Sequence, residues 1–284
     1  MTFWKQQAFG CRFSELYTPF DDGMGPAIEA TASAIKQLCP NARTILDLGS
    51  GHGEPGCTVA ARFPSAAVIC SDVSQSMLDL AAKRAADKSL ANLSTMILDL
   101  GDLRAIGAAS QDVVTANFVM QNAADLQASL REIHRVLKPG GVLVGTLWQV
   151  FSVPTVAAEV CAELMALPAP GPEAEKDSGT MRLADVEMVN REFSEAHFEF
   201  CEGHDSAGET SFNVGEVAGD AWKHVMLSHL TKLEEMEKAG DTSVQERTRA
   251  AVEKAAVACG YVKEGVLCMP GTFRNFRVAK PAVA

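Results

Sequence analysis

Short apolar runs alternate with longer amphipathic stretches through the first half of the chain. The short runs have the length and the β-branched content of buried strands, and they occur at 44–48, 67–71, 93–98, 112–118 and 142–148. The longer stretches repeat apolar residues every three or four positions, which predicts helices at 26–38, 54–63, 74–87 and 124–137. Such alternation predicts the α/β class, with a doubly wound, mostly parallel sheet between helices.

The second half of the chain departs from this alternation. Helical patterns occur at 155–166, 183–193, 214–230, 231–238 and 243–258, and a polar, proline-rich loop occupies 168–179. Strand patterns occur at 196–202 and, as a final hairpin, at 265–281. Before the first helix, Pro19 predicts an extended or turn segment at 17–23.

These patterns predict one domain over residues 1–284. Its expected parts are an N-terminal flap at 1–24, a ligand-binding core at 25–150, a helical lid or insertion after the fifth strand at 151–230, and C-terminal helices with a hairpin at 231–284.

The composition narrows the class of partner. The chain has a net charge of −11 and no cluster of five or more Lys or Arg residues, so neither nucleic acid nor an anionic membrane is expected to bind it. The eight cysteines are scattered, and no signal-peptide core or membrane-spanning run is present, which predicts a soluble, cytoplasmic protein. His197, Cys201 and His204 lack a fourth ligand and do not share one face of a strand, so no metal site is predicted.

The first apolar run ends in the pattern Asp47-x-Gly49-x-Gly51-x-Gly53. Glycines at this spacing let the backbone turn sharply and let a ligand approach the main chain. A dinucleotide site needs G-x-G-x-x-G, and the third glycine here has a different offset. The acid inside the strand also favours a cationic ligand over a pyrophosphate. Both features disfavour a nicotinamide-dependent oxidoreductase.

The segment from Asp47 to Gly53 resembles motif I of the class I S-adenosylmethionine-dependent methyltransferases. Residues 131–148, R-E-I-H-R-V-L-K-P-G-G-V-L-V-G-T-L-W, are similar to the family's sequence around the end of a helix and the next strand. The small-molecule branch, with the ubiquinone- and menaquinone-biosynthesis-type enzymes, is the part of the family that the chain resembles. The resemblance implies a Rossmann-like methyltransferase fold with S-adenosyl-L-methionine as cofactor. It further implies that the methionine end of the cofactor is held by Asp47, Gly49, Ser50, Gly51 and Gly53.

An acid at the end of the second strand is a further candidate for cofactor binding. Asp72 lies 19 residues after Gly53, where an acid can accept hydrogen bonds from ribose hydroxyls, and Val73 follows it. The alternative is that Asp72 caps the following helix.

The resemblance also implies an acid that accepts from the adenine amine and an apolar side chain that covers the ring. The order G-D-L favours Asp102 with Leu103, while Asp99 stays open as the acid. Asn117 and Phe118, at the end of the fourth strand, complete the expected cofactor contacts.

The methyl acceptor is expected at the same edge of the sheet. Its candidate contacts are Tyr17, Met120, Gln121, Trp148 and Trp222. His224 and His229 are candidate general bases for an oxygen or nitrogen acceptor, with a buried structural or a surface role as the alternative, and a thioether acceptor needs no base.

The sequence therefore predicts methyl transfer to O, N or S of a small metabolite by in-line displacement, with release of S-adenosylhomocysteine. A regulatory protein that binds the cofactor without transferring methyl is the alternative. The sequence leaves the oligomeric state open.

Overall fold

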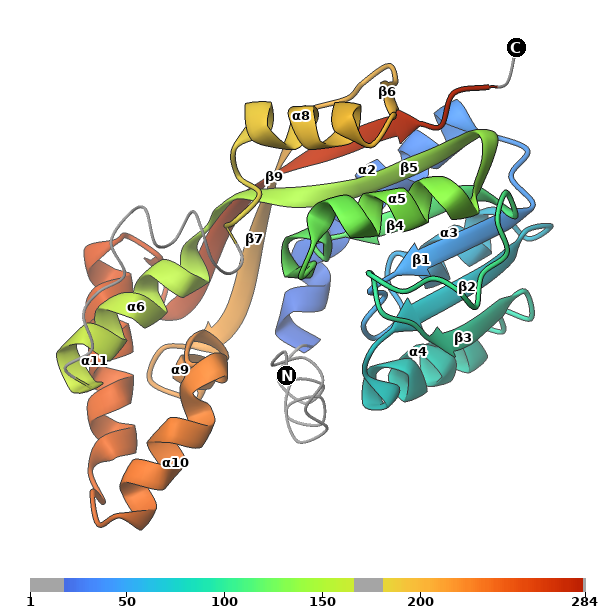
Figure 1. Ribbon diagram of the computed structural model, residues 1–284. Helices are drawn as coiled ribbons and strands as arrows, with labels where there is room; N and C mark the ends of the chain where they lie inside the picture. Colours follow the sequence, from blue (N-terminus) through green and yellow to red (C-terminus); the bar gives the residue numbers. More distant parts are fainter. Residues whose placement is uncertain (1–17, 166–180, 283–284) are drawn as a thin grey trace.

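The computed structural model describes residues 18–165 and 181–282, and Figure 1 shows a central sheet with helices on both of its faces. With the labels of Figure 1, the helices and strands in chain order are α2 (Thr18–Leu38), β1 (Thr44–Leu48), α3 (Gly56–Arg62), β2 (Ala67–Asp72), α4 (Gln75–Asp87), β3 (Leu93–Ile97), β4 (Gln111–Asn117), η2 (Met120–Asn122), α5 (Leu126–Val136), β5 (Leu137–Phe151), α6 (Ser152–Met165), α8 (Val186–Glu195), β6 (Glu199–Phe200), β7 (Ser206–Glu216), α9 (Ala221–Val225), η3 (Leu227–His229), α10 (Leu230–Lys238), α11 (Val244–Ala258), β8 (Val262–Lys263) and β9 (Val266–Ala279).

A nine-stranded sheet organises the described part of the chain. Its main path is β3-β2-β1-β4-β5-β9-β6, and the pairs from β3 to β5 are parallel. β9 is antiparallel to β5, and β6, β7 and β8 pair antiparallel with β9. The predicted α/β, mostly parallel fold is therefore confirmed. The carboxyl ends of the parallel strands share one edge, where ligands bind in folds of this class.

Buried apolar side chains cover both faces of the parallel strands. On one face Ile35 of α2 and Val59 of α3 belong to the same cluster as Val113 of β4. On the other face Leu130 of α5 belongs to a cluster with Leu46 of β1. Burial on both sides explains why these strands have continuous apolar runs instead of an alternating pattern.

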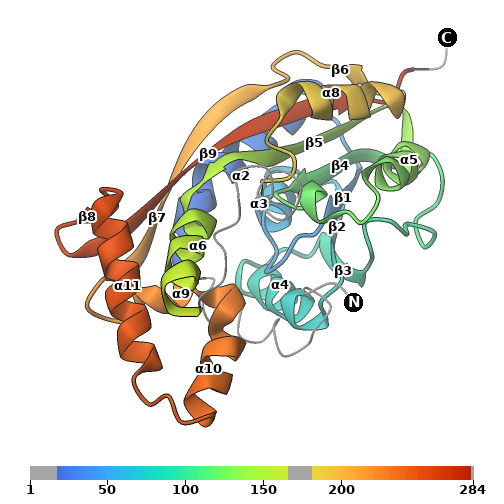
Figure 2. The same ribbon diagram turned by 60° about the vertical axis from the view of Figure 1, so that its left-hand side comes forward.

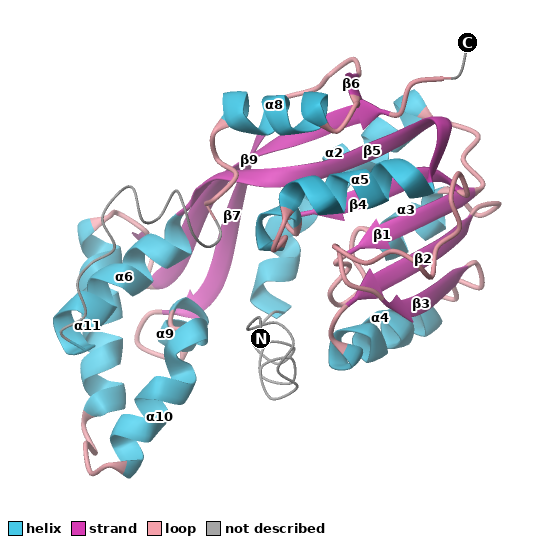
Figure 3. Ribbon diagram, viewed as in Figure 1, coloured by secondary structure: helices cyan, strands magenta, loops and turns pink. Residues whose placement is uncertain are grey.

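The strands β5, β7 and β9 continue beyond the carboxyl end of β4. Thr146 of β5 pairs with Asn117, the last residue of β4, and β5 then runs on to Phe151. The helices α6, α9, α10 and α11, which we call the helical extension, gather at the far end of β7 and β9 (Figures 1 and 2). Trp222 of α9 and Val252 of α11 join an apolar cluster with Phe212 of β7. Figure 3 shows that antiparallel strands connect this extension to the parallel sheet.

The structure corrects several predicted boundaries. α2 begins at Thr18 and not at residue 26, so the expected extended segment at 17–23 is wrong for residues 18–23. Pro19 falls in the first turn of the helix, where a missing N–H costs nothing. α3 begins at Gly56 and not at residue 54. Residues 138–141 lie within β5, at an irregularity of its pairing with β4, where a turn was expected.

Residues 151–230 do not form a continuous helical insertion, because β6 and β7 join the sheet within them. β7 escaped prediction because its buried alternation is limited to Thr210, Phe212 and Val214. Gly215, with φ +110°, lies near the end of that strand, and the next helix starts only at Ala221. The predicted helix at 214–230 is therefore wrong. The predicted flap at 1–24 lies mostly outside the described residues.

A substitution at Gly145 tests how closely β5 packs against Ala116 of β4 and Phe276 of β9. A Cβ on Gly145 would lie 2.1 Å from the carbonyl oxygen of Ala116 and 2.5 Å from Cζ of Phe276. Gly145→Ala should lower the free energy of unfolding by about 2–3 kcal/mol, because backbone or ring must move to admit the methyl group. Urea unfolding monitored by circular dichroism measures this change.

Gly107, in the loop before β4, is the control, because its φ lies outside the left-handed region and a Cβ there would lie 3.7 Å from Ser110, at ordinary van der Waals distance. Gly107→Ala should leave the stability within about 1 kcal/mol of the wild type. Equal stability of the two variants would contradict the close packing at Gly145.

Candidate cofactor and acceptor site

Three glycines form a tight turn at the carboxyl end of β1. Gly49, Gly51 and Gly53 have φ values of +62°, +52° and +106°, in a region that other residues rarely adopt. A Cβ on Gly49 would lie 2.3 Å from Val119, and a Cβ on Gly53 would lie 3.1 Å from Ala81. Among the residues that the structure describes, a Cβ on Gly51 would meet nothing within 4 Å. The outer two glycines are therefore required by packing, whereas the main chain of Gly51 faces open space.

Asp47 lies fully buried beneath this turn. Gly56 N donates to Asp47 Oδ2 at 2.9 Å, and Thr115 Oγ1 donates to Asp47 Oδ1 at 2.6 Å. Burial raises the pKa of Asp47 to about 7, although both hydrogen bonds act in the opposite direction. The carboxylate thus supports the turn from inside, and its predicted direct contact with a ligand stays a prediction.

Asp72 joins the glycine turn to the start of α4. Gly51 N donates to Asp72 Oδ2 at 3.1 Å, and Ser74 N donates to Asp72 Oδ1 at 2.9 Å. Burial raises the pKa of the Asp72 carboxyl. Asp72 and Val73 are partly exposed, whereas Ser50 is 2% exposed and its side chain belongs to the interior. Asp72 therefore bonds the amide of Ser74, the residue before α4, but no amide within that helix, so helix capping is not observed and the ribose contact stays a prediction.

The turn after β3 changes the expected adenine contacts. Leu103 is fully buried in the cluster that includes Leu130, so the apolar surface that could cover a ring is already covered by other apolar side chains. The choice of Leu103 is therefore wrong, and partly exposed Leu100 is the apolar candidate. Asp102 is engaged by Arg104, whose Nε and Nη2 lie 2.8 Å and 2.6 Å from its two oxygens.

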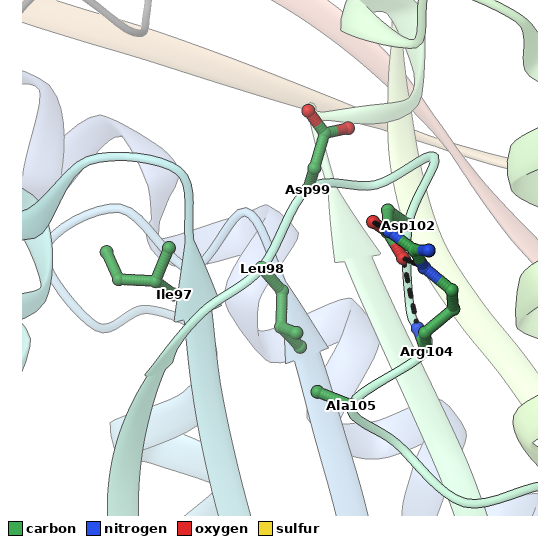
Figure 4. A pocket seen from close by; sticks show the side chains of 6 residues that line it. All are labelled: Ile97, Leu98, Asp99, Asp102, Arg104 and Ala105. Atoms are coloured by element: carbon green, nitrogen blue, oxygen red, sulfur yellow. Dashed lines mark hydrogen bonds and ion pairs between the residues drawn. The ribbon is translucent and has the colours of Figure 1, made fainter.

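A pocket with a volume of about 530 Å³ lies beside this turn. Asp99 and Asp102 both line it but point to different sides of the turn, and Leu98 points away from both acids, toward Ala105 (Figure 4). The dashed contact in Figure 4 is the pairing of Asp102 with Arg104. The residues that line the pocket include none from the glycine turn, so this pocket alone does not define a nucleotide site. Because Asp102 is already engaged by Arg104, Asp99 is the other candidate for the adenine acid, and either contact stays a prediction.

The loop after β4 holds a strained aromatic residue. Phe118 has φ +51°, a conformation that is unusual for a bulky side chain. Phe118 N donates to Thr146 O at 2.9 Å, and Gln121 Nε2 donates to Phe118 O at 2.5 Å. Next to it, Thr31 Oγ1 donates to Asn117 Oδ1 at 2.9 Å. Strain that is held in this way is typical of functional sites.

Three aromatic rings stack beside this loop. The ring centroids of Phe118 and Trp148 lie 4.0 Å apart at 19°, and those of Trp148 and Phe151 lie 4.5 Å apart at 9°. Trp148 is 3% exposed and Met120 is 1% exposed. The rings at the two ends of the stack, Phe118 and Phe151, are half-buried. The outer rings are therefore the accessible ones, and Trp148 and Met120 support them.

The other acceptor candidates lie in the helical extension and in the η3 turn that follows α9. Trp222 is buried, His224 and His229 are partly buried, and a break after α9 separates His229 from the other two. Trp222 Nε1 and His229 Nδ1 have no hydrogen-bond partner within the described ranges. Burial lowers the pKa of His229, so its imidazole is neutral near pH 7 and can accept a proton. Tyr17 lies outside the described residues.

The sequence pattern missed two residues that support the glycine turn. A Cβ on Gly56 would lie 2.2 Å from Cys70 Sγ and 2.8 Å from Asp47 Oδ2, so only glycine fits there. The side chain of Glu54 is 8% exposed and forms ion pairs with Lys88 at 3.1 Å and Arg84 at 3.4 Å. The fourth glycine, three residues after Gly53, was the available signal for the first of them.

Over residues 18–165 and 181–282, no group of three or more His, Cys, Asp or Glu side chains is arranged to hold a metal ion. Within the same ranges, no helix combines the length and the apolar character that crossing a bilayer requires.

Comparison with known proteins assigns the family. Residues 46–143 match the family model described as a methyltransferase domain, which covers the glycine turn and the strands up to the first part of β5. Residues 46–143 form a methyltransferase domain. The predicted family is thereby confirmed.

This methyltransferase domain resembles enzymes with different acceptors. A demethylmenaquinone methyltransferase of Deinococcus radiodurans is 36% identical over 115 residues, which are 40% of this chain and 46% of that protein. A trans-aconitate 2-methyltransferase of Azoarcus sp. is 35% identical over 147 residues, which are 51% of this chain and 52% of that protein. The chain thus spans about half the length of the curated relatives it matches.

A solved structure shares the methyltransferase fold. Phosphoethanolamine N-methyltransferase 2 of Haemonchus contortus, in complex with S-adenosyl-L-methionine, superimposes with a TM-score of 0.54 at 16% identity. The alignment covers 96% of this chain and 57% of that one. At this identity the likeness concerns the fold alone.

Asp47 should make the stability of the domain depend on pH. The pKa of Asp47 is about 7 in the folded chain, against 3.8 for an aspartate outside the fold. Between pH 3.8 and pH 7 the folded state therefore keeps a proton that the unfolded state has lost. The contribution of Asp47 to stability therefore falls as pH rises through this window and is constant above it. Asp47→Asn resembles the protonated acid, because its amide can accept from Gly56 N and donate to Thr115. The stability of this variant should therefore stay constant over this pH window, whereas that of the wild type should fall by on the order of a few kcal/mol.

Urea unfolding at intervals from pH 5 to pH 8 measures the difference between wild type and variant. Asp79→Asn is the control, because Asp79 is exposed on α4 and should leave the pH profile unchanged. Parallel profiles for wild type and Asp47→Asn would contradict the assignment of the titration to Asp47.

Proposed function

We propose that this protein transfers a methyl group from S-adenosyl-L-methionine to a small-molecule acceptor and releases S-adenosylhomocysteine. The observation that carries the proposal is the open main chain of Gly51, tied to Asp72 within the methyltransferase domain. The Haemonchus methyltransferase of the same fold, which binds S-adenosyl-L-methionine, supports this choice of cofactor.

The residues at the strand ends suit this cofactor. The open backbone of Gly51 would contact its methionine end, and Asp72 with Val73 would receive the ribose hydroxyls. Asp99 would accept from the adenine amine and Leu100 would cover the ring, in place of the predicted pair Asp102 and Leu103. The acids Asp47, Glu54 and Asp72 lie close enough to one another for their charges to interact, so the turn suits a cationic ligand. Asn117 and Phe118 would face the cofactor from the loop after β4.

The chemistry needs positioning more than acid–base groups. When bound, the cofactor supplies an electrophilic methyl group, whose bond to sulfur breaks as the lone pair of the acceptor attacks the methyl carbon. Phe118 and Phe151 would orient the acceptor and exclude water. His229 would take the proton of a hydroxyl or amine acceptor, with His224 as the other candidate, while a carboxylate or thioether acceptor releases no proton.

The region 151–230 would select the acceptor, with Gln121 and Trp222 as polar contacts. Gln121 Oε1 and Trp222 Nε1 are both buried and have no hydrogen-bond partner in the part of the chain that the structure describes. A hydroxyl or amine of the acceptor could donate to the first, and an oxygen of the acceptor could accept from the second. The cytoplasmic location and the absence of a nucleic-acid partner stay predictions from composition.

The proposal is tested by incubating the protein with S-adenosyl-L-methionine labelled at the methyl group and a small-molecule extract of its source cells. Mass spectrometry should find the label in a new metabolite, and fragmentation identifies the accepting atom. Failure of the protein to bind S-adenosyl-L-methionine would overturn the proposal. Binding without transfer to any metabolite would favour a regulatory protein instead.

Gly51→Ala should weaken the binding of S-adenosyl-L-methionine by at least about tenfold, because the new methyl group projects into the space that a ligand would occupy. Gly260→Ala is the matched control, since Gly260 also has a positive φ, +74°, and open surroundings at the end of α11. Both variants should lose about 1–2 kcal/mol of stability to backbone strain. Isothermal titration calorimetry measures the affinities, and an equal loss of affinity in both variants argues against a cofactor at Gly51.

A further inference from the structure

A fully buried arginine lies outside the residues assigned so far. Arg274 of β9 is 0% exposed. Its Nη2 lies 3.1 Å from Asn190 Oδ1 and 2.7 Å from Asp205 Oδ1. Its Nε and Nη1 have no hydrogen-bond partner among the residues that the structure describes. A buried guanidinium with unmet donors is costly, so the place calls for a further acceptor.

The pairing of the strands places Arg274 level with the carboxyl end of β4. Arg274 pairs with Leu147 of β5, and the preceding residue, Thr146, pairs with Asn117 at the end of β4. The backbone of Arg274 therefore lies at the edge of the sheet where the loop after β4 begins. This is the edge at which ligands of such sheets bind.

The side chain of Arg274 lies on the face that α5 and α8 cover. Its neighbour Leu147 belongs to the buried cluster of that face, together with Met120 of the loop after β4. Arg182, just before α8, donates from Nη1 to Ala123 O at 2.6 Å, so the approach to α8 touches the same loop. The side chain of Arg274 thus lies between β9 and α8, and the segment that leads into α8 contacts the loop after β4.

The existing partners leave these donors open. Asp205 is the acid nearest to Arg274, and it also accepts from Asn190 Nδ2 at 2.9 Å and lies 3.2 Å from His204 Nε2. Asp205 Oδ1 lies 2.7 Å from Nη2 of the arginine but makes no hydrogen bond within the described residues, and no contact of Asp205 with Nε or Nη1 is observed there. Carboxylate oxygens are the acceptors that a guanidinium binds best, because the hydrogen bonds are charge-assisted.

We propose that Arg274 anchors a carboxylate group of the methyl acceptor. This inference rests on the proposed function and narrows the acceptor to an organic acid. It is consistent with the match to a relative that is named for trans-aconitate, a tricarboxylate. If the anchored group is not the one methylated, the arginine fixes the acceptor by a charge that is remote from the reacting atom.

The Nε–H signal of Arg274 provides the direct test. Heteronuclear NMR spectra are recorded on the whole protein, labelled with 15N-arginine and saturated with S-adenosylhomocysteine, and Arg274→Lys identifies the signal. The probes are trans-aconitate, malonate and benzoate, with the trimethyl ester of trans-aconitate as the neutral control. At least one carboxylate should shift the Arg274 signal saturably, and the ester should not. A signal that no carboxylate shifts overturns the proposal.

Calorimetry on variants gives a second readout. Arg274→Lys should bind the active carboxylate about tenfold to a hundredfold more weakly, because the ammonium group cannot replace the guanidinium donors. Its affinity for S-adenosylhomocysteine should stay within about twofold. Arg277→Lys is the matched control on the same strand, because Arg277 bonds Asn275 and Gln37 instead. Unchanged carboxylate affinity in Arg274→Lys, or an equal loss in both variants, would overturn the anchor.

The two proposals fail in different ways. Absence of S-adenosylhomocysteine binding in the wild type would count against the proposed function. Cofactor binding with an unresponsive Arg274 would count against the carboxylate anchor alone. If Arg274→Lys does not fold, loss of one signal in Arg274→Gln assigns it, and the titration of the wild type decides.

Discussion

The buried carboxylate of Asp47 is the interaction on which the glycine turn depends. It accepts from Thr115 in β4 and from Gly56 at the start of α3, so one side chain links the central pair of strands to the helix that follows the turn. Burying an acid is costly, and the two donors offset only part of that cost, since burial still raises the pKa of Asp47 to about 7. The glycines allow the turn, and this side chain links its two ends.

The alternation of residues along β9 gives its two faces opposite chemical characters. Phe273 contributes to the apolar cluster that includes the ring stack and the helical extension, with its ring edge-on to Phe118. The next residue, Arg274, points to the other face and meets Asn190 of α8. Strand geometry thus places aromatic rings on one face of β9 and a buried cation on the opposite face, near the same edge of the sheet.

The sequence predicted the parallel sheet well, because β1, β2 and β4 are short apolar runs that are buried on both faces. The glycine turn and Asp72 were also recognisable, since their spacing follows from local backbone geometry. Leu103 was misassigned because an acid followed by an apolar residue does not reveal which of them faces the interior. Arg274 gave no signal at all, because its burial depends on α8 and on the turn after β6, which pack on β9 from distant parts of the sequence.

The second half of the chain was harder to predict for a related reason. β7 has little apolar content, and Gly208 within it packs against Phe273, so its place in the sheet depends on the partner strand. The predicted helix at 214–230 failed because Gly215 permits a backbone conformation that ends the strand locally. The position of β7 and the end of that strand depend on pairing with β9, so the local sequence does not reveal them.

β9 is also the last element of the described chain, and it pairs with β5, β6, β7 and β8. During synthesis the parallel strands can assemble early, but the outer strands have no partner until residues 266–279 leave the ribosome. A nascent chain paused before that point would expose the edge of β5 and the unpaired β7. Contacts that span so much sequence also form slowly. The parallel sheet and the outer strands should therefore mature at different times, and the intermediate with the exposed edge should be the one most prone to aggregation.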